Sequence, residues 1–418
     1  MTLRPCPDTA GFSLTRRHAL LGLTAAFTLG RISMAVAAAA TEQRFVVVLL
    51  RGALDGLSAV QPYGDPAFAE LRGPLALPPP GSTGGVLDLG GLYGLHPSLR
   101  AVAALYAAGE ALPIHAVAGH YRSRSHFEAQ DCLESGADQR LNSGWLNRAV
   151  SLMPVAPGRD LALSVGLSAP LLLRGPATVE AWAPDHFAQP TSDLYQRLLH
   201  ISASDPVIGP AMAEGLKQRG FALNVLAGQA GAGQTGTGQA GAGQAADRAQ
   251  DRSFEVFAGS AGRLLAQPRG PRVAVLEVGG WDTHAGQLRR LDVALTQLDR
   301  GLAALAAGLA DTWQRTVVLV VTEFGRTAHI NGTGGTDHGT AGVAFVLGGR
   351  VAGGRVLADW PGLGQGKLFE NRDLAPTTDL RSVIKGVLID HMHMRPADMD
   401  TVLPGSISAQ PTSGLIQT

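Results

Sequence analysis

The chain has 418 residues, enough to bury a large core as one big α/β domain or two smaller ones. Its 34 Lys and Arg residues balance its 34 Asp and Glu residues, and this net charge of zero offers no electrostatic footprint for nucleic acid or for an anionic membrane. Charged residues make up only 16% of the chain and glycines number 54, which fits a globular, loop-rich protein better than a disordered or fibrous one.

The first 40 residues (1–40) have the pattern of an export signal. Arg16 and Arg17 come directly before an apolar region, and the small residues at 35–40 resemble a cleavage site. A glycine and an arginine interrupt the apolar region, so it is too short to be a stable membrane span. The paired arginines predict that the twin-arginine export machinery carries the folded protein to the periplasm or out of the cell. The remainder, 41–418, is predicted to be a single domain.

The first buried strand is predicted at 45–50, where consecutive apolar residues leave no polar face. Asp55 follows the end of this strand between Gly52 and Gly56, where the backbone can turn sharply. This position suits a metal ligand on the first strand–helix loop. It suits equally well an aspartate that caps the segment after it.

The next predicted strand, 111–119, leads into a second informative stretch. Ser125 and the glutamate three residues later match a capping box, which predicts a helix beginning at His126. Ser125 is therefore either a cap or a nucleophilic hydroxyl, placed beside Arg124 where the helix dipole would stabilise an anionic ester. Ser123 is the competing nucleophile. His126 is either a metal ligand or a residue of the polar helix face.

The middle of the chain contains a Gly/Ala/Gln-rich repeat at 228–247 with no apolar face, which predicts a flexible insertion in the domain. The α/β pattern resumes with a strand at 273–278 and a long amphipathic helix at 287–310. Between them, Asp282 and His284 stand two residues apart among glycines and form a candidate metal clamp. The predicted apolar stripe of the helix consists of Leu288, Leu291, Leu295, Leu298 and Leu302. A C-terminal helix is predicted near 380–394, with His391 and His393 on its surface.

The stretch at 317–349 has the highest density of candidate functional groups. Its first five residues are apolar and mostly β-branched, which predicts another buried strand. Glu323 and Arg326 follow this strand, and Asp337 and His338 come after a glycine-rich turn. Charged groups gathered where a buried strand ends are what an open α/β sheet presents to a ligand or a metal.

Seven segments, in chain order, carry a family resemblance: RFVVVLLRGALDGL, GLYGLHPSL, RSRSHFEAQDCLESG, GGWDTHAGQ, TEFGRT, NGTGGTDHG and GGRVLADWPGL. They resemble the bacterial family known as domain of unknown function 1501, from about Arg44 to nearly the end of the chain. The core of that family resembles the alkaline phosphatase superfamily of phosphatases, sulfatases and phosphomutases. The resemblance implies a doubly wound α/β fold with a mostly parallel sheet, helices on both faces, and one or two divalent ions at the C-terminal edge of the sheet.

The resemblance also implies roles for individual residues. Ser125 matches the nucleophile by its position after the second strand. Arg326 and Arg124 are predicted to bind non-bridging ester oxygens, which guanidinium geometry suits. Glu323 and Phe324 stand where the superfamily usually has Asp-His, so an oxygen-rich site for Ca²⁺, Mg²⁺ or Mn²⁺ becomes an alternative to Zn²⁺. The implied metal ligands are Asp55, Asp282, His284, Glu323 and His338.

The sequence thus predicts an exported, metal-dependent hydrolase of phosphate or sulfate esters. Its substrate would be an anionic ester, and the ion would lower the pKa of the Ser125 hydroxyl for in-line attack. The alternative is a non-enzymatic exported protein that keeps the fold and uses the site for binding or assembly. The missing imidazole beside Glu323 favours this alternative.

Overall fold

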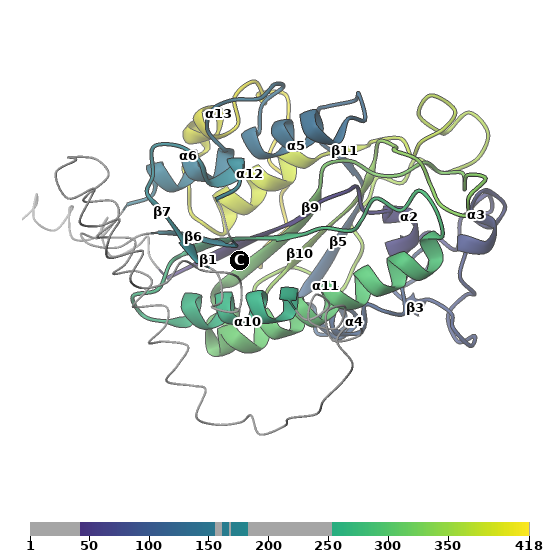
Figure 1. Cartoon of the computed structure of the whole chain (residues 1–418), viewed down its shortest axis with the longest axis horizontal. Helices are drawn as coiled ribbons and strands as arrows, with labels where there is room; N and C mark the ends of the chain where they lie inside the picture. Colours follow the sequence, from purple (N-terminus) through teal and green to yellow (C-terminus); the bar gives the residue numbers. More distant parts are fainter. Residues whose placement is uncertain (1–41, 155–160, 167–168, 183–252, 418) are drawn as a thin grey trace, which may run out of the picture. The chain divides into compact units, whose positions relative to one another are not determined.

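In the computed structural model, the first apolar run becomes β1 (Arg44–Leu50), whose residues are all buried inside an eight-stranded sheet. The strand order is β11-β5-β10-β9-β1-β8-β6-β7. Figure 1 shows this sheet between helices above and below it. β1 pairs in parallel with β8 and β9, whereas β10 runs antiparallel to both β9 and β5. The predicted α/β class with a mostly parallel sheet is therefore confirmed. The other strands of this sheet are β5 (Ala111–Ala118), β6 (Ala162–Val165), β7 (Val179–Trp182), β8 (Val273–Val278), β9 (Thr316–Thr322), β10 (Gly342–Leu347) and β11 (Thr378–Asp379).

The structure describes residues 42–154, 161–166, 169–182 and 253–417. Residues from Gln43 onward belong to one compact unit. The predicted signal peptide (1–40) and the predicted insertion (228–247) lie outside the described residues, so the domain boundaries remain predictions. Within the described ranges, no helix is both long and apolar enough to cross a membrane.

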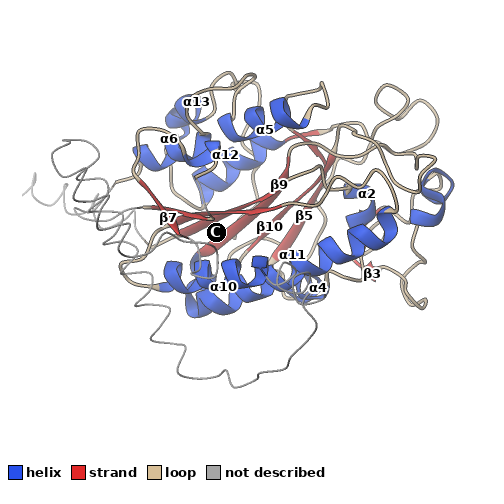
Figure 2. Ribbon diagram, in the orientation of Figure 1, coloured by secondary structure: helices blue, strands red, loops and turns tan. Residues whose placement is uncertain are grey.

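Helices cover both faces of the sheet (Figure 2), as the family resemblance implies. The side chains of β1 alternate between the two faces, so Val46 and Val48 pack in the core under α10 and α11, while Phe45 and Val47 pack in the core under α6 and α12. A separate three-stranded sheet consists of β2 (Val60–Gln61), β4 (Gly94–Leu95) and β3 (Leu87–Asp88). The α-helices are α2 (Gly56–Ala59), α3 (Phe68–Arg72), α4 (Arg100–Ala107), α5 (His126–Ser135), α6 (Trp145–Leu152), α10 (Ser253–Ala266), α11 (Gln287–Leu309), α12 (Leu380–Asp390) and α13 (Met399–Val402).

Two details of the helix predictions need correction. The long amphipathic helix is α11, and four leucines of its predicted stripe are buried, but Leu288 in the first turn is 47% exposed. The sequence also places His391 and His393 on a helix surface. Instead, His391 is buried and its Nε2 donates to the carbonyl of Arg44 at 2.8 Å, and burial lowers its pKa to about 4. A neutral imidazole is therefore part of the core at the amino end of β1.

The parallel pairing brings four informative loops to one edge of the sheet. β1, β5, β8 and β9 all point the same way, so the loops after them start at the same edge. Because β10 runs antiparallel to β9, it starts at this edge too, so the long loop between β9 and β10 begins and ends at the same edge. Gly325 lies in this loop at a point of close backbone approach, since a Cβ there would meet the carbonyl oxygen of Ala341 at 1.9 Å.

We expect Gly325→Ala to lower the free energy of unfolding by about 1–3 kcal/mol, because backbone atoms must shift to admit the methyl group. Gly364→Ala is the matched control, since a Cβ at Gly364 would meet no atom within 4 Å. Urea unfolding of the two variants measures the difference. Equal unfolding midpoints would show that the loop tolerates the methyl group.

Candidate metal centre

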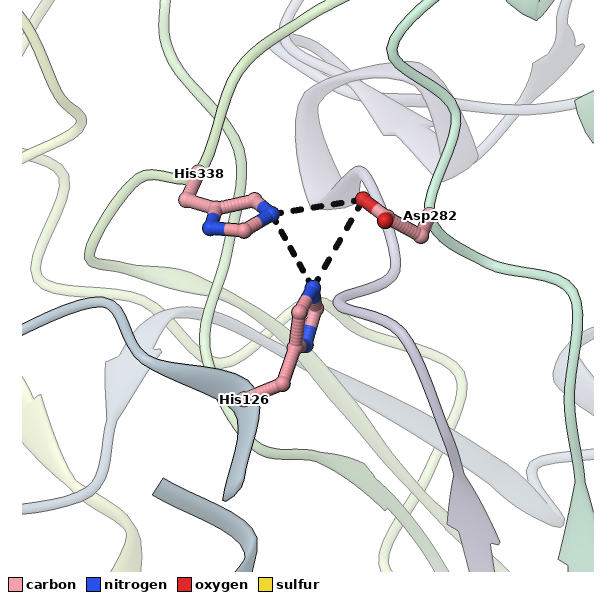
Figure 3. A group of neighbouring side chains, drawn as sticks. All are labelled: His126, Asp282 and His338. Carbon is pink, nitrogen blue, oxygen red and sulfur yellow. Dashed lines mark hydrogen bonds and ion pairs between the residues drawn. The ribbon is translucent and has the colours of Figure 1, made fainter. Parts of the chain in front are cut away.

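Three side chains from distant parts of the chain point toward one another at this edge (Figure 3). His126 is the first residue of α5, Asp282 follows β8, and His338 lies in the loop between β9 and β10. The Nε2 atoms of His126 and His338 are 3.0 Å apart, and Oδ1 of Asp282 lies 3.3 Å from the His338 Nε2 atom and 3.6 Å from that of His126. Their potential ligand atoms all lie close enough together to hold one metal ion.

Each of the two imidazoles is held from behind by a hydrogen-bond acceptor. Nδ1 of His126 donates to Oε1 of Glu323 at 2.7 Å, and Nδ1 of His338 donates to the backbone carbonyl of Arg124 at 3.0 Å. Since neither acceptor carries a proton to give, these contacts assign the ring hydrogen to Nδ1. The Nε2 lone pairs therefore face the centre, as they do in metal-binding histidines.

His284 adds a third imidazole to the same group. Its Nε2 lies 3.0 Å from Nε2 of His338 and 3.0 Å from Oδ1 of Asp282. Its Nδ1 donates to Asp337 at 3.1 Å, so this ring has the same arrangement of an acceptor behind and a lone pair in front. The side chain of Asn331 donates to both the His284 carbonyl and the Asp337 carboxylate, which fixes the two residues relative to each other.

These distances fit a bound cation. Two neutral nitrogens with facing lone pairs repel each other unless a proton or a metal ion lies between them. Nitrogens that share a tetrahedral zinc ion at about 2.0–2.1 Å lie roughly 3.3 Å apart, close to the separation of the imidazoles. In the metal-free protein the proton belongs on His126, because the hydrogen bond to Glu323 raises the pKa of His126 while burial lowers the pKa of His338.

Arg326 holds the carboxylate of the group. Its side chain is buried, and Nη1 donates to Oδ1 of Asp282 at 2.7 Å. Its other two nitrogens donate to the hydroxyl and the carbonyl of Thr336. Burial raises the pKa of Asp282, but the hydrogen bond and charge of Arg326 outweigh burial, so the pKa is lowered overall. Asp282 is therefore a carboxylate near neutral pH.

Glu323, a predicted metal ligand, lies behind His126 and outside the group of three. Its carboxylate is buried and accepts from the Gly52 amide, His126 and Gln130 through Oε1 and from the Thr322 hydroxyl through Oε2. Burial raises the pKa of Glu323, but the hydrogen bonds, that of His126 foremost, lower it overall. In the structure Glu323 contacts His126, a candidate ligand, and direct contact of Glu323 with a metal ion remains a prediction.

Asp55 is also occupied by other partners. Its fully buried carboxylate forms an ion pair with the fully buried Arg72 and accepts from the side chains of Ser58 and Gln287. It is also the N-cap of α2 and accepts from the Ser58 amide. The capping alternative is therefore the arrangement that the structure contains, and the ligand role remains a prediction.

Ser125 occupies the predicted helix start, but the predicted capping box is wrong. α5 begins at His126, and within the described chain the Ser125 side chain makes no hydrogen bond to the first turn of α5. The Glu128 carboxylate accepts instead from the hydroxyl of Tyr121. Ser125 is partly exposed, so its hydroxyl is not consumed by the helix and lies directly before a candidate ligand. The competing Ser123 is exposed.

Arg124, predicted to bind ester oxygens, has two acidic partners. Its guanidinium donates to the buried Asp373 at 2.9 Å and to the exposed Glu370 at 2.5 Å. Its backbone has a positive φ of 62°, which is uncommon for a residue with a side chain. This conformation accompanies the contact between the Arg124 carbonyl and His338. Arg124 therefore contributes to the group through its main chain.

Two participants could not be assigned from the sequence. The sequence leaves two roles open for His126, ligand or helix surface, and its position at a helix start after a strand is the signal that points to it. Arg72 gives no signal, because it lies in a short helix, α3, 17 residues after its partner Asp55. Only the fold brings Arg72 to Asp55.

The fold and the group together define an α/β protein with a candidate metal centre at the carboxyl edge of a mostly parallel sheet. The chain belongs to the family described as "Protein of unknown function (DUF1501)", whose model matches residues 95–403. The predicted family is thereby confirmed. No protein with a curated description matches the sequence.

Solved structures similar to the chain include a protein of the alkaline phosphatase superfamily from Vibrio parahaemolyticus (10% identity, TM-score 0.36, covering 76% of this chain). The chain spans 62% of that protein, which is less than two thirds of its length. Another is the C-terminal periplasmic domain of EcEptC from Escherichia coli in complex with zinc (9%, TM-score 0.31, 74% of each chain). A third is the alkaline phosphatase of the Antarctic bacterium TAB5 (9%, TM-score 0.34, 75% of this chain and 94% of that one). Similarity at this level carries no information on activity.

We expect Asp55→Ala to lower the free energy of unfolding by about 3–5 kcal/mol, because it leaves the charge of Arg72 buried and unpaired. Asp55→Ala combined with Arg72→Met should lose less than the sum of the single changes, since the pair is removed together. Asp359→Ala, at an exposed carboxylate, is the control. If Asp55→Ala instead leaves stability unchanged and reduces metal content, Asp55 is a ligand.

The contact between His126 and Glu323 predicts a pH dependence. The raised pKa of His126 gives stability that is present below pH 6.5 and lost as pH rises through the folded value, and the lowered pKa of Glu323 gives stability that is present above pH 4.5. Glu323→Gln should therefore destabilise the metal-free protein more at pH 6 than at pH 9, measured by urea unfolding. Glu370→Gln is the control, because its partner Arg124 keeps its charge at both pH values. An equal loss at the two pH values would contradict the assignment.

Proposed function

We propose that the protein is an exported, metal-dependent hydrolase of phosphate or sulfate esters. The observation that supports this most is the convergence of three imidazole Nε2 atoms on one carboxylate oxygen, with an acceptor behind every ring. His126, Asp282 and His338 would hold the ion, with His284 beside them. A divalent ion bound there would act as a Lewis acid on ester oxygens and would lower the pKa of a neighbouring hydroxyl.

Ser125 is the candidate nucleophile. It precedes α5, whose first N–H groups and positive dipole end favour an anionic group. Its partial exposure leaves the hydroxyl reachable from solvent, and its neighbour in sequence is a candidate ligand. In this proposal the helix supplies contacts to the ester. The Ser125 oxygen loses its proton and attacks the phosphorus or sulfur atom, the bond to the alcohol oxygen breaks, and the alcohol leaves with a proton. Water then hydrolyses the ester on Ser125, which releases phosphate or sulfate and restores the hydroxyl.

The arginines have a supporting role in this proposal. Arg326 positions Asp282, and Arg124 presents its carbonyl to His338. Both guanidinium groups already have acidic partners, so contacts with the ester oxygens fall to the ion and to the amino end of α5. Export by the twin-arginine machinery, to the periplasm or the medium, is proposed on the paired Arg16 and Arg17.

A hydrolysis assay with aryl phosphates, aryl phosphodiesters and aryl sulfates tests the proposal. We expect Ser125→Ala to lower kcat by about 10³-fold or more, since it removes the attacking oxygen. Chelation should abolish turnover, and zinc should restore it. Ser123→Ala is the matched control and should retain activity. Loss of activity in Ser123→Ala alone would assign the nucleophile to Ser123.

A second candidate is a non-enzymatic binding or assembly protein with the same fold. The specific observation that favours it is that both predicted oxyanion-binding arginines are paired with carboxylates. Such a protein would bind metal, turn over none of the three ester classes, and show no difference between wild type and Ser125→Ala. The same assay therefore separates the two functions.

A further inference from the structure

We infer that the centre holds a single divalent transition-metal ion with four protein ligands, and that two buried side chains close the neighbouring positions to a second ion. Three ligands are His126, Asp282 and His338, whose ligand atoms all lie near one another. We assign His284, which lies beside Asp282 and His338, as the fourth. This inference rests on the metal-binding part of the proposed function and is independent of hydrolysis.

His284 is the fourth protein ligand in this inference, and an ester oxygen would bind as a fifth, since zinc can expand to five ligands. The Nε2 atom of His284 lies as close to His338 Nε2 as that of His126 does, and it also lies 3.0 Å from Oδ1 of Asp282. The loop after it is built to hold the ring, because Asn331 and Thr333 both donate to the His284 carbonyl at 2.9 and 2.7 Å. The His284 side chain is 44% exposed, yet hydrogen bonds fix both the backbone carbonyl of the residue and its ring Nδ1. Nε2 is thereby positioned for a partner.

The donor set selects the kind of ion. Three imidazole nitrogens and one carboxylate oxygen suit borderline ions such as zinc, which accept nitrogen ligands in four-coordinate sites. Magnesium and calcium require six or more oxygen ligands. The carboxylates that could have supplied more oxygen, Asp55 and Glu323, have other partners.

Arg72 closes the position at Asp55. The Arg72 side chain extends from α3 to Asp55, and its guanidinium nitrogens donate to Asp55, Ser58 and the carbonyl of Thr327. Both Arg72 and Asp55 are fully buried. The permanent positive charge of Arg72 thus balances the one carboxylate that a second ion would need there, and that ion would have to displace a buried guanidinium.

Phe324 closes the position beside Glu323. Its ring centroid lies 4.9 Å from that of His126 and 5.2 Å from that of His338, so an apolar ring packs against two of the candidate ligands. Phe324 is itself buried and offers no atom to a metal. Glu323 already accepts hydrogen bonds at both oxygens. A second ion at this position would therefore meet one saturated carboxylate and a hydrocarbon surface.

Zinc binding to the purified full chain tests the inference. Metal-free protein is titrated with zinc in competition with a chromophoric chelator, and bound zinc is counted by elemental analysis. We expect one zinc ion per chain and no magnesium binding in the same range. Two tightly bound zinc ions per chain, or none, would overturn the inference.

His284→Asn should weaken zinc binding at least about 10-fold. His393→Asn is the matched control, because His393 is exposed and lies away from the centre, two residues after His391, which contacts the amino end of β1. Asp337→Asn, at a 52% exposed side chain, is a second variant that should weaken zinc binding by loosening His284 even if His284→Asn folds poorly. Unchanged affinity in both variants would remove His284 from the shell. One bound zinc ion without ester hydrolysis would contradict the proposed function and support this inference. Two bound zinc ions with ester hydrolysis would support the proposed function and contradict this inference.

Discussion

The candidate centre depends on the parallel pairing of β1 with β8 and β9. These strands are far apart in sequence, and their pairing places the loops that carry Asp55, Asp282 and Glu323 at one edge. β5 delivers α5 to the same edge because it pairs with the antiparallel β10. The sequence of any one of these loops is not enough to bring the side chains of the centre together. The apolar composition of the strands therefore determines the chemistry indirectly, by deciding which loops meet.

Beneath this edge, a buried polar network connects the residues that look like ligands to those that act as their supports. Gln287, the first residue of α11, donates to Asp55 and accepts from Thr336, and Thr336 in turn accepts from Arg326, which holds Asp282. Such networks are stable in a low-dielectric interior when each member has a partner. Asp55 is thus one end of a rigid path that finishes at the candidate ligand Asp282, which accounts for an aspartate at that loop without requiring it to touch an ion.

The sequence predicted the architecture better than the roles of the site residues. Buried strands appear as apolar runs, so β1, β8 and β9 and the α/β alternation are accessible from composition and spacing, whereas the mostly parallel, doubly wound sheet is implied by the family resemblance. The sequence does not show which residues are ligands and which support them, because this depends on which side chains lie nearest the centre in the folded protein. Glu323 has suitable chemistry but sits behind His126, and His126 looked ambiguous because a helix start offers a histidine either to solvent or to a site. Long-range partners such as Arg72 have no sequence pattern at all.

A centre with one cation has consequences for the charge of the ester that it could accept. The carboxylates of Asp282, Glu323 and Asp337 all lie on or just behind the ligand shell, and together they would balance the charge that a divalent ion brings. The two arginines nearby are neutralised by Asp282, Asp373 and Glu370. What remains for the substrate is the amino end of α5, which carries about half a unit charge. In the proposed hydrolase, the charge of the ester would therefore be met by the ion and by this helix end.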